Sequence, residues 1–364
     1  MNRERALEAA APFITPLAVV DEEVMEGNLA RMAAVAAGHR VALRPHAKTH
    51  KSAEVARRQM AHGAVGLTAA TLVEAEVFAE AGIADLLVAH PPVGTAKLRR
   101  LEALAGRVRR LAVSLDDVGV AESIPTAVEV LWEVDTGLHR IGTAPGAQTV
   151  AAVRRLVAAI SAARFRGLIT HAGHAYASTD QAQRRQAAEE ESAGLTDTAE
   201  MLRAEGIEVR ERSVGSTPTA GLALHPGITE MRPGTYVYGD ANQVTLGSQR
   251  LEDCALAVVA TVVSNPAADR AVIDAGSKAL SADLRVSGLD GYGIVVGNER
   301  LCVARLSEEH AVVTGPGRTG LAIGDRIAII PAHACTTVNL HPSLLIVPRE
   351  GTPRWQAVDA RGWR

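Results

Sequence analysis

The chain has 364 residues, 47% of them hydrophobic, so it is long enough to bury a large core and to form one large domain with a smaller one. A formal net charge of −3 gives no broad positive field, which argues against a nucleic-acid partner and favours a small molecule. The first residues, MNRERALEAAAPFITP, mix both charges without a sustained apolar run, so we expect no signal peptide, no membrane helix and a cytoplasmic location.

Helical patterns alternate with short apolar runs between about residue 21 and residue 235. A helix over 21–38 comes first, and eight candidate strands follow at 41–45, 64–68, 85–90, 110–115, 128–134, 165–170, 208–214 and 228–233. Strands that alternate with helices form parallel sheets, and eight such units predict an α/β fold of the (β/α)8 TIM-barrel type.

The pattern changes after about residue 246, where apolar runs rich in Val and Ile are separated by Gly, Pro, Asn and Asp. These runs lie at 254–264, 270–276, 291–297, 301–306, 310–315 and 325–334. They predict a C-terminal all-β domain. We therefore expect a barrel domain over 20–245 and a β domain over 246–364 that residues 1–19 join.

Lys48 follows the first predicted strand within RPHAKTHK, at the barrel end where ligands bind. Burial or the neighbouring cations Arg44 and His46 would lower its pKa and make its amine a nucleophile. A solvated loop lysine is the ordinary alternative.

Small and hydroxylated residues follow the seventh and eighth strands, where barrels often bind phosphate. Gly215, Ser216 and Thr217 come after the seventh strand, and Gly234 and Thr235 after the eighth. Two ordinary glycine turns would have the same composition. A phosphate site that faces the same barrel end as a nucleophilic lysine favours a phosphorylated aldehyde cofactor.

Arg140 and His171 follow the fifth and sixth strands, which places them beside a ring lying across the barrel mouth. Arg140 would bond the ring or its phenolic oxygen, and His171 would pack on its face. The structural alternatives are an ion pair between Arg140 and Asp135, and a hydrogen-bonded core histidine at position 171.

His333 and Cys335 stand two apart in HACTTVNLH and would face the same way in an extended chain. Imidazole and thiolate together suit a zinc-like ion, and two protein ligands leave room for water and substrate oxygens. Many such pairs are incidental. With Cys254 and Cys302 the chain has three widely spaced cysteines, which do not indicate a disulfide framework.

Six segments between about residue 15 and residue 341 together resemble the D-serine dehydratase and D-threonine aldolase family of alanine-racemase-like, fold type III pyridoxal phosphate enzymes. They are TPLAVVD, RPHAKTHK, EVDTGLHRIG, VGSTPT, MRPGTYVYGD and HACTTVNL. The resemblance implies a barrel with a β domain, usually in a homodimer.

By the same resemblance, Lys48 matches the lysine that forms the Schiff base with pyridoxal 5'-phosphate, and His333 with Cys335 matches a divalent metal pair. The thiolate favours zinc, with manganese as the alternative. The residues implied to lie around the phosphate and the cofactor are Ser216, Thr217, Gly234, Thr235 and Tyr236.

The implied function is that of a cofactor- and metal-dependent lyase of a D-3-hydroxy amino acid. In a dehydratase for D-serine or D-threo-3-hydroxyaspartate, Lys48 would remove the α-proton and the products would be a 2-oxo acid and ammonia. The His-x-Cys pair resembles these dehydratases, whereas the TTVNL that follows Cys335 resembles the aldolases.

Three alternatives remain open at this point. In retro-aldol cleavage to glycine and an aldehyde, His50 or His174 would act as the base toward the substrate hydroxyl. An amino-acid racemase would share the barrel but would not respond to chelation. A non-catalytic pyridoxal phosphate-binding protein would resemble only the barrel, so the β domain argues against it.

Overall fold

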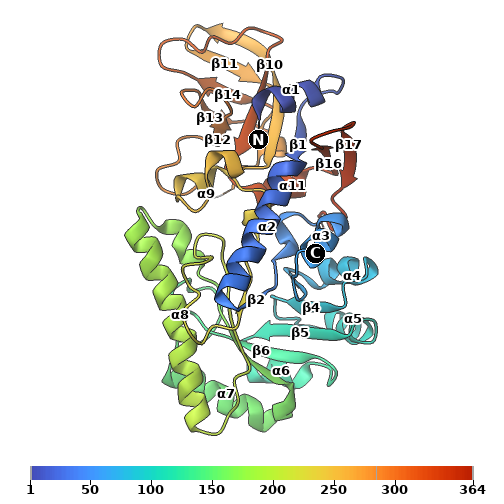
Figure 1. The fold of residues 1–364 in the computed structure, drawn as a ribbon, viewed down its shortest axis with the longest axis vertical. Coiled ribbons are helices and arrows are strands. Elements are labelled where there is room, and N and C mark those ends of the chain that lie inside the picture. The colour runs from blue at the N-terminus through green and yellow to red at the C-terminus, as the bar shows by residue number, and fades with distance from the viewer. Residues whose placement is uncertain (1, 284, 363–364) are drawn as a thin grey trace. The chain divides into compact units, whose positions relative to one another are not determined.

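The computed structural model describes residues 2–283 and 285–362, which form two compact units (Figure 1). One, here called the α/β unit, contains Arg31–Lys48 and Ala53–Gly234. The other, here called the β unit, contains the residues up to Ala30, together with Thr49–Ser52 and Thr235–Gly362. The chain therefore passes from the α/β unit into the β unit directly after Lys48 and again directly after Gly234.

Eight parallel strands form the sheet of the α/β unit, in the order β2-β9-β8-β7-β6-β5-β4-β3. All eight confirm predicted strands: β2 (Ala42–Leu43), β3 (Leu67–Ala69), β4 (Asp85–Val88), β5 (Arg110–Leu115), β6 (Glu129–Glu133), β7 (Phe165–Ile169), β8 (Glu211–Val214) and β9 (Glu230–Met231). The two end strands also meet, because the backbone nitrogen of Val65 donates to Leu43 O at 2.9 Å and His46 forms a parallel bridge with Thr68.

Helices accompany the strands. They are α2 (Glu22–His39), α3 (Ala53–Ala61), α4 (Leu72–Glu80), α5 (Thr95–Ala105), α6 (Val118–Ser123), α7 (Ala147–Ala159) and α8 (Gln181–Ala204), with short 3-10 turns η1 (Ala47–Thr49), η2 (Ala162–Arg164) and η3 (Gly173–Ala177). Of these, α4, α6 and α8 begin at polar capping residues. Thr71, Asp117 and Asp180 each accept a hydrogen bond from the backbone of the first turn that follows. These caps explain where α4, α6 and α8 start.

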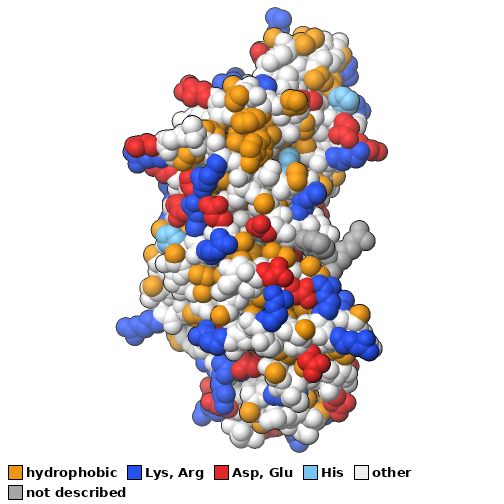
Figure 2. Space-filling model, turned by 90° about the vertical axis from the view of Figure 1, so that its right-hand side faces the viewer, with side chains coloured by type: hydrophobic (Ala, Val, Ile, Leu, Met, Phe, Trp, Pro, Cys, Tyr) orange, Lys and Arg blue, Asp and Glu red, His pale blue; other side chains and the backbone are white. Residues whose placement is uncertain are grey.

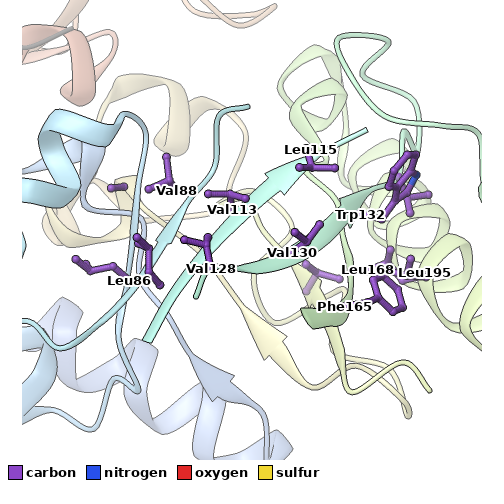
Figure 3. Close-up of a cluster of buried hydrophobic side chains, with 14 of the residues drawn as sticks. Leu86, Val88, Val113, Leu115, Val128, Val130, Trp132, Phe165, Leu168 and Leu195 are labelled. Atoms are coloured by element: carbon purple, nitrogen blue, oxygen red, sulfur yellow. The ribbon is translucent and has the colours of Figure 1, made fainter. Parts of the chain in front are cut away.

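The strands are apolar on both faces, as expected for a parallel sheet covered by helices. Figure 3 shows the larger cluster, in which Trp132, Phe165 and Leu168 lie near Leu195 of α8. The alternate positions form a second buried cluster, made of Leu87, Ala112, Leu131 and Ile169. Because side chains alternate along a strand, the second cluster belongs to the opposite face of the sheet.

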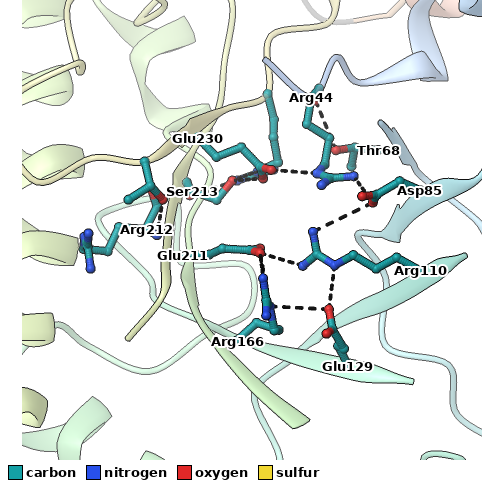
Figure 4. Close-up of polar contacts among 12 residues, drawn as sticks. Arg44, Thr68, Asp85, Arg110, Glu129, Arg166, Glu211, Arg212, Ser213 and Glu230 are labelled. Atoms are coloured by element: carbon teal, nitrogen blue, oxygen red, sulfur yellow. Dashed lines mark hydrogen bonds and ion pairs between the residues drawn. The ribbon is translucent and has the colours of Figure 1, made fainter. Parts of the chain in front are cut away.

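Charged residues, most of them at or near the starts of strands, form a network in the same unit, and Arg44 joins it from the end of β2 (Figure 4). Arg44 bonds Asp85 at 2.6 Å and Glu230 at 2.7 Å. Arg110 bonds Glu129 at 2.5 Å and Glu211 at 2.7 Å. Burial by itself lowers the pKa of Arg44, but Glu230 and Asp85 raise the pKa by more than burial lowers it. Arg44 is therefore charged and holds two carboxylates.

Replacement of Arg44 by methionine is expected to lower the free energy of unfolding by about 3–5 kcal/mol, because it leaves Asp85 and Glu230 buried without their shared cation. Urea denaturation followed by circular dichroism measures this. The control is Arg154→Met, which breaks an exposed contact to Glu205 and should change stability by less than about 1 kcal/mol. Equal effects of the two variants would contradict the interpretation of Figure 4.

The β unit contains a nine-stranded sheet in the order β11-β14-β13-β12-β15-β10-β1-β16-β17. Its strands are β1 (Leu17–Asp21), β10 (Leu256–Ala267), β11 (Arg270–Ile273), β12 (Gly293–Val295), β13 (Cys302–Leu306), β14 (Ala311–Thr314), β15 (Arg326–Pro331), β16 (Ser343–Val347) and β17 (Arg354–Ala357). The six strands β10–β15 confirm the six runs predicted after residue 246. Most pairs are antiparallel, but β1 pairs in parallel with β16.

The β unit also carries short helices, and the surface is mixed in charge. The helices are α1 (Arg3–Ala10), α9 (Ala241–Thr245), α10 (Ser277–Leu280) and α11 (Ala334–Leu340), with 3-10 turns η4 (Thr235–Val237) and η5 (Leu251–Asp253). On the face drawn in Figure 2, acidic and basic side chains are interspersed. Among the described residues, no helix combines the length and apolarity needed to span a membrane.

Candidate active site

A cavity of about 550 Å³ opens at the carboxyl ends of the parallel strands, within the α/β unit. Its volume is in the range of small-molecule sites. The ionisable residues that line it are the cations Lys48, Lys97, Arg140 and Arg232, the imidazoles His46, His90 and His171, and the carboxylate Glu133. The position agrees with the rule that ligands of such barrels bind at the carboxyl ends of the strands.

Lys48 lies on the 3-10 turn η1, directly after β2, and its half-buried side chain lines the cavity. His46 is held two residues earlier, where its backbone nitrogen donates to Pro233 O at 2.9 Å. Burial lowers the pKa of His46 well below the ordinary value, and the positive charge of Lys48 lowers it further. His46 is therefore a neutral neighbour of the lysine, so it adds no second charge beside the amine.

His171 lines the cavity with a defined tautomer. Its Nδ1 contacts the backbone oxygen of Gly215, and because a carbonyl only accepts, Nδ1 carries the proton. Burial lowers the pKa of His171 well below the ordinary value, with Lys48 adding to the effect. His171 is thus a half-buried, hydrogen-bonded histidine that also lines the cavity.

Arg232 and Glu133 are two cavity residues that the sequence reasoning missed. The Arg232 guanidinium is buried, its Nε donates to Ser213 Oγ at 2.8 Å, and it also bonds the Thr170 carbonyl. Burial lowers the pKa of Arg232, although Glu133, Glu230 and Glu191 act in the opposite direction. Burial raises the pKa of Glu133, which accepts a hydrogen bond from Ser114.

A two-residue spacing in the sequence could have identified Arg232 and Glu133. Glu129 and Glu133 are both at alternate positions of β6, on the same face as the buried Leu131, and Arg232 is two residues after Glu230. Polar residues that share the inward face of a barrel strand, at its carboxyl end, are candidates for the site.

The predicted phosphate residues Ser216 and Thr217 are buried in the segment that follows β8. Ser216 Oγ lies 2.8 Å from Thr219 Oγ1, and Thr219 donates to Glu191 Oε2 of α8 at 2.8 Å. Glu191 also accepts from the backbone nitrogen of Gly215 at 2.9 Å. Burial raises the pKa of Glu191, and these hydrogen bonds oppose that shift. A buried carboxylate therefore fixes the backbone of this segment.

The remaining predicted residues lie in different places. Arg140 lines the cavity, and its suggested ion pair with Asp135 is wrong, because His139 takes that carboxylate at 3.0 Å. Gly234 ends the α/β unit, whereas Thr235 and Tyr236 begin the 3-10 turn η4 of the β unit.

His50 and His174, the two histidines considered as bases, are not among the residues that line the cavity. His50 is buried in the β unit, where its Nδ1 accepts from the backbone nitrogen of Ser52 at 3.1 Å. His174 lies on η3 with Nε2 3.9 Å from Glu190, and burial lowers its pKa. It packs under Gly137, where a Cβ would come within 3.2 Å of the imidazole.

His333 and Cys335 occur together at the start of α11 in the β unit, and the extended chain predicted for this segment is wrong. His333 is the N-cap of α11, and Cys335 lies in its first turn. Asp240 helps the helix begin here, because its Oδ2 accepts a hydrogen bond from the backbone nitrogen of Ala334 at 2.9 Å. His333 Nδ1 lies 2.6 Å from Asp283. Burial alone would lower the pKa of His333, but Cys335 and Asp283 raise it well above the ordinary value.

Two threonine hydroxyls surround the Cys335 sulfur within the β unit. Thr49 Oγ1 is 3.1 Å from Cys335 Sγ, and Thr235 Oγ1 is 3.7 Å from it. Thr49 directly follows Lys48, and Thr235 directly follows Gly234. The sulfur therefore contacts the first residue of the β unit at each of the two points, after Lys48 and after Gly234, where the chain leaves the α/β unit.

The chemistry of these residues fits an anionic aromatic aldehyde and a divalent cation. The cavity offers a lysine amine, two guanidinium groups and a neutral imidazole face, which suit an aldehyde, an anionic ring substituent and the ring itself. Imidazole and thiolate are ligands that zinc accepts. Among the described residues no third His, Cys, Asp or Glu completes a metal cluster with this pair.

Comparison with known proteins gives one consistent picture. Residues 20–242 match the alanine racemase N-terminal domain family, and residues 255–347 match the putative serine dehydratase domain. The chain is 36% identical to the D-threo-3-hydroxyaspartate dehydratase of Delftia sp. (strain HT23), over 96% of this chain and 98% of that protein. It is 33% identical to the D-threonine aldolase of Arthrobacter sp., over 96% and 93%. The solved structure of the Delftia sp. HT23 dehydratase superposes with a TM-score of 0.86 at 34% identity and covers 95% of this chain and 97% of that one.

Proposed function

The chain belongs to the D-serine dehydratase and D-threonine aldolase family of alanine-racemase-like, fold type III pyridoxal phosphate enzymes, and from this premise we propose that it is a D-3-hydroxy amino acid dehydratase. The proposed products are a 2-oxo acid and ammonia. The observation that carries the proposal is the cavity in which Lys48 lies with a neutral His171 and the guanidinium groups of Arg140 and Arg232.

Lys48 would hold pyridoxal 5'-phosphate, which supplies an electron sink for the bond broken at the substrate α-carbon. Ser216, Thr217, Gly234 and Thr235 are the proposed phosphate residues, and Tyr236 is proposed to lie near them. Glu191 supports this role for Ser216, since it fixes the segment through Gly215 and Thr219.

The side chains of the cavity would have separate roles in proton transfer and in orienting the ring. A free Lys48 amine would take the α-proton, and this proton and the 3-hydroxyl would be lost together as water. His171 keeps a fixed ring orientation because Nδ1 bonds the Gly215 carbonyl. The enamine product then tautomerises and is hydrolysed to the 2-oxo acid and ammonia.

His333 and Cys335 would hold a divalent cation, with zinc favoured over manganese, and this ion would act as a Lewis acid toward the substrate hydroxyl. Asp283 supports this role because it bonds His333 Nδ1 and leaves Nε2 for the metal. A carboxylate behind a metal-binding imidazole is a common arrangement that fixes the ring.

The variant Asp283→Asn is expected to weaken zinc binding by about 10–100-fold, because the amide orients the His333 ring less strongly. Competition with a zinc-binding dye measures the affinity without any substrate. Asp290→Asn removes the same charge from an exposed position of the same segment and is the control. Equal affinities of the wild type and D283N would show that Asp283 does not position the imidazole.

Product identification tests the proposed reaction directly. The purified enzyme, loaded with pyridoxal 5'-phosphate and zinc, is incubated with D-serine, D-threonine and D-threo-3-hydroxyaspartate, with and without a chelator. A 2-oxo acid and ammonia in equal amounts support dehydration. Stereochemical inversion without consumption of the amino acid would instead identify a racemase, and bound cofactor without any turnover would identify a binding protein.

Retro-aldol cleavage is the second candidate, and the similarity to the D-threonine aldolase of Arthrobacter sp. favours it. Glycine and an aldehyde would be the products. His50 or His174 would then take the hydroxyl proton. The variants His50→Gln and His174→Gln, assayed for aldehyde release, distinguish the two bases.

We further propose a homodimer, on the family likeness alone. Light scattering coupled to size-exclusion chromatography would test it.

A further inference from the structure

Three side chains of the α/β unit form a hydrogen-bonded series, here called the Glu191 series, that consists of Glu191, Thr219 and Ser216. Glu191 of α8 is fully buried, and its Oε2 accepts a hydrogen bond from Thr219 Oγ1 at 2.8 Å. Ser216 Oγ lies 2.8 Å from the same Thr219 hydroxyl. The series therefore connects a buried carboxyl group to the serine that is proposed to bind the cofactor phosphate.

The direction of these hydrogen bonds is fixed when Glu191 is ionised, because each hydroxyl group has a single proton. An ionised carboxylate only accepts, so the Thr219 proton is directed to Glu191 and the Ser216 proton is directed to Thr219 Oγ1. The backbone nitrogen of Thr219 also donates to Ser216 Oγ, at 3.4 Å. In this state the Ser216 hydroxyl has no proton left for another acceptor.

A phosphate dianion brings only acceptor oxygens, so a hydroxyl group that binds it must donate. If Ser216 simply turned its proton to the phosphate, two buried hydroxyl oxygens would face each other without a proton between them. A proton on Glu191 Oε2 avoids this, because Glu191 would then donate to Thr219 and Thr219 would donate to Ser216. Glu191 Oε1 would still accept from the backbone nitrogens of Gly215 at 2.9 Å and Ala172 at 3.3 Å.

The charges around Glu191 favour protonation when a dianion binds nearby. Burial raises the pKa of Glu191, while the hydrogen bonds that it accepts and the charge of Arg232 oppose this shift. Arg232 follows β9 and is shared, because Glu133 and Glu230 act on the same guanidinium. His171, which follows β7, is kept neutral by burial and adds no charge. A dianion would add like charge in buried surroundings, which raises the pKa of a carboxyl group further.

Resting on the proposed phosphate role of Ser216, we propose that Glu191 is a positioning residue that takes up one proton from solvent when the cofactor phosphate binds. This proton reverses the Glu191 series, so that Ser216 donates to the phosphate. The proton returns to solvent when the phosphate leaves. Glu191 takes no part in the bond-breaking step.

Proton uptake on binding of pyridoxine 5'-phosphate tests this proposal without any amino acid. This alcohol carries the phosphate but forms no imine with Lys48, and pyridoxine is the matched ligand without phosphate. Calorimetry at about pH 8, in phosphate-free buffers of different ionisation enthalpy, counts the protons, and the free ester is then a dianion because its second pKa is about 6. We expect the wild type to take up about one proton more with the ester than with pyridoxine. Equal uptake with both ligands would overturn the proposal.

Glu191→Gln imitates the protonated carboxyl group, because its amide can donate to Thr219 while its oxygen accepts from Gly215. E191Q should bind the ester without the extra proton. The bound wild type holds one proton more than the free form, so its affinity falls as the pH rises, by up to about tenfold per pH unit relative to E191Q. Glu189→Gln removes the same charge from an exposed position of α8 and should behave as the wild type. Wild-type uptake in E191Q would place the proton elsewhere and refute the role of Glu191.

Thr219→Val is a second variant, which keeps the carboxyl group but interrupts the Glu191 series. A protonated Glu191 then lacks its acceptor, so the extra proton uptake should fall well below that of the wild type. Retention of the full uptake in T219V would contradict the proposed reversal.

Ser216→Ala separates this inference from the proposed phosphate site. We expect S216A to bind the ester about tenfold or more weakly, because it removes a charge-assisted hydrogen bond. If S216A shows this loss but the wild type takes up no extra proton, only the role of Glu191 is rejected. If S216A binds the ester as tightly as the wild type, the phosphate role of Ser216 and the inference that rests on it both fail.

Discussion

Replacement of Lys48 by alanine is expected to reduce turnover by about 10²–10⁴-fold and to abolish covalent retention of pyridoxal 5'-phosphate. The variant removes both the amine that would hold the cofactor and the proposed base, and a positioned base alone accounts for a factor of that size. Borohydride treatment of the wild type, followed by peptide mass spectrometry, should fix the cofactor at position 48. K48A should show no adduct.

Lys51 provides the control for this experiment, since it stands three residues further along the chain. Its Nζ donates to Asn339 Oδ1 at 2.8 Å, so a structural role is expected for it. Lys51→Gln should keep the adduct at Lys48 and most of the activity. An adduct that moves to another lysine, or a fully active K48A, would refute the assignment of the cofactor lysine.

Loss of the metal pair is expected to have the second large effect. His333→Ala and Cys335→Ser should each lower dehydration by at least about 10²-fold, because a Lewis acid on the leaving hydroxyl contributes several kcal/mol to transition-state stabilisation. Chelation should have the same effect on the wild type, and added zinc should reverse it there but not in the variants. Zinc content by mass spectrometry gives the accompanying loss of metal.

Cys302→Ser is the matched control, because Cys302 lies on β13, away from α11 in the sequence, and is only half-buried. Burial and Asp290 raise the pKa of its thiol, which makes it a poor metal ligand at neutral pH. C302S should retain zinc and activity. Full dehydration activity of C335S without bound metal would rule out metal assistance in this reaction.

The positions of the parallel strands follow from the sequence because each strand has its own local signal. Runs such as RLAVSL and VEVLWEV are short and apolar and lie between amphipathic helices, and β5 and β6 occur where these runs are. The strand ends also indicate where ligands bind, so the position of Lys48 at the cavity is accessible to sequence reasoning. Arg232 can be predicted as a site residue only from its spacing, because it stands two residues after Glu230 and therefore faces the same side of the chain.

Other parts of the site depend on contacts between residues far apart in the chain. Asp283 reaches His333 over 50 residues, and Thr49 reaches Cys335 over 286. No local pattern encodes such pairs. The helix at α11 is a smaller case, since HACTTVNLH has β-branched residues that favour an extended chain, whereas Asp240 caps the helix from 94 residues away.

The ion pairs that Arg44 and Arg110 form with residues at the starts of strands have a practical consequence for protein engineering. Arg44 and Arg110 bind strand residues at the end remote from Lys97, since β4 and β5 begin at Asp85 and Arg110 whereas Lys97 follows the opposite end of β4. Mutations of cavity residues between β4 and the first turn of α5 therefore leave these ion pairs intact. Libraries randomised at the cavity residues Val93 and Lys97 should therefore keep the thermal stability of the wild type, which makes these two positions a favourable starting point for directed evolution.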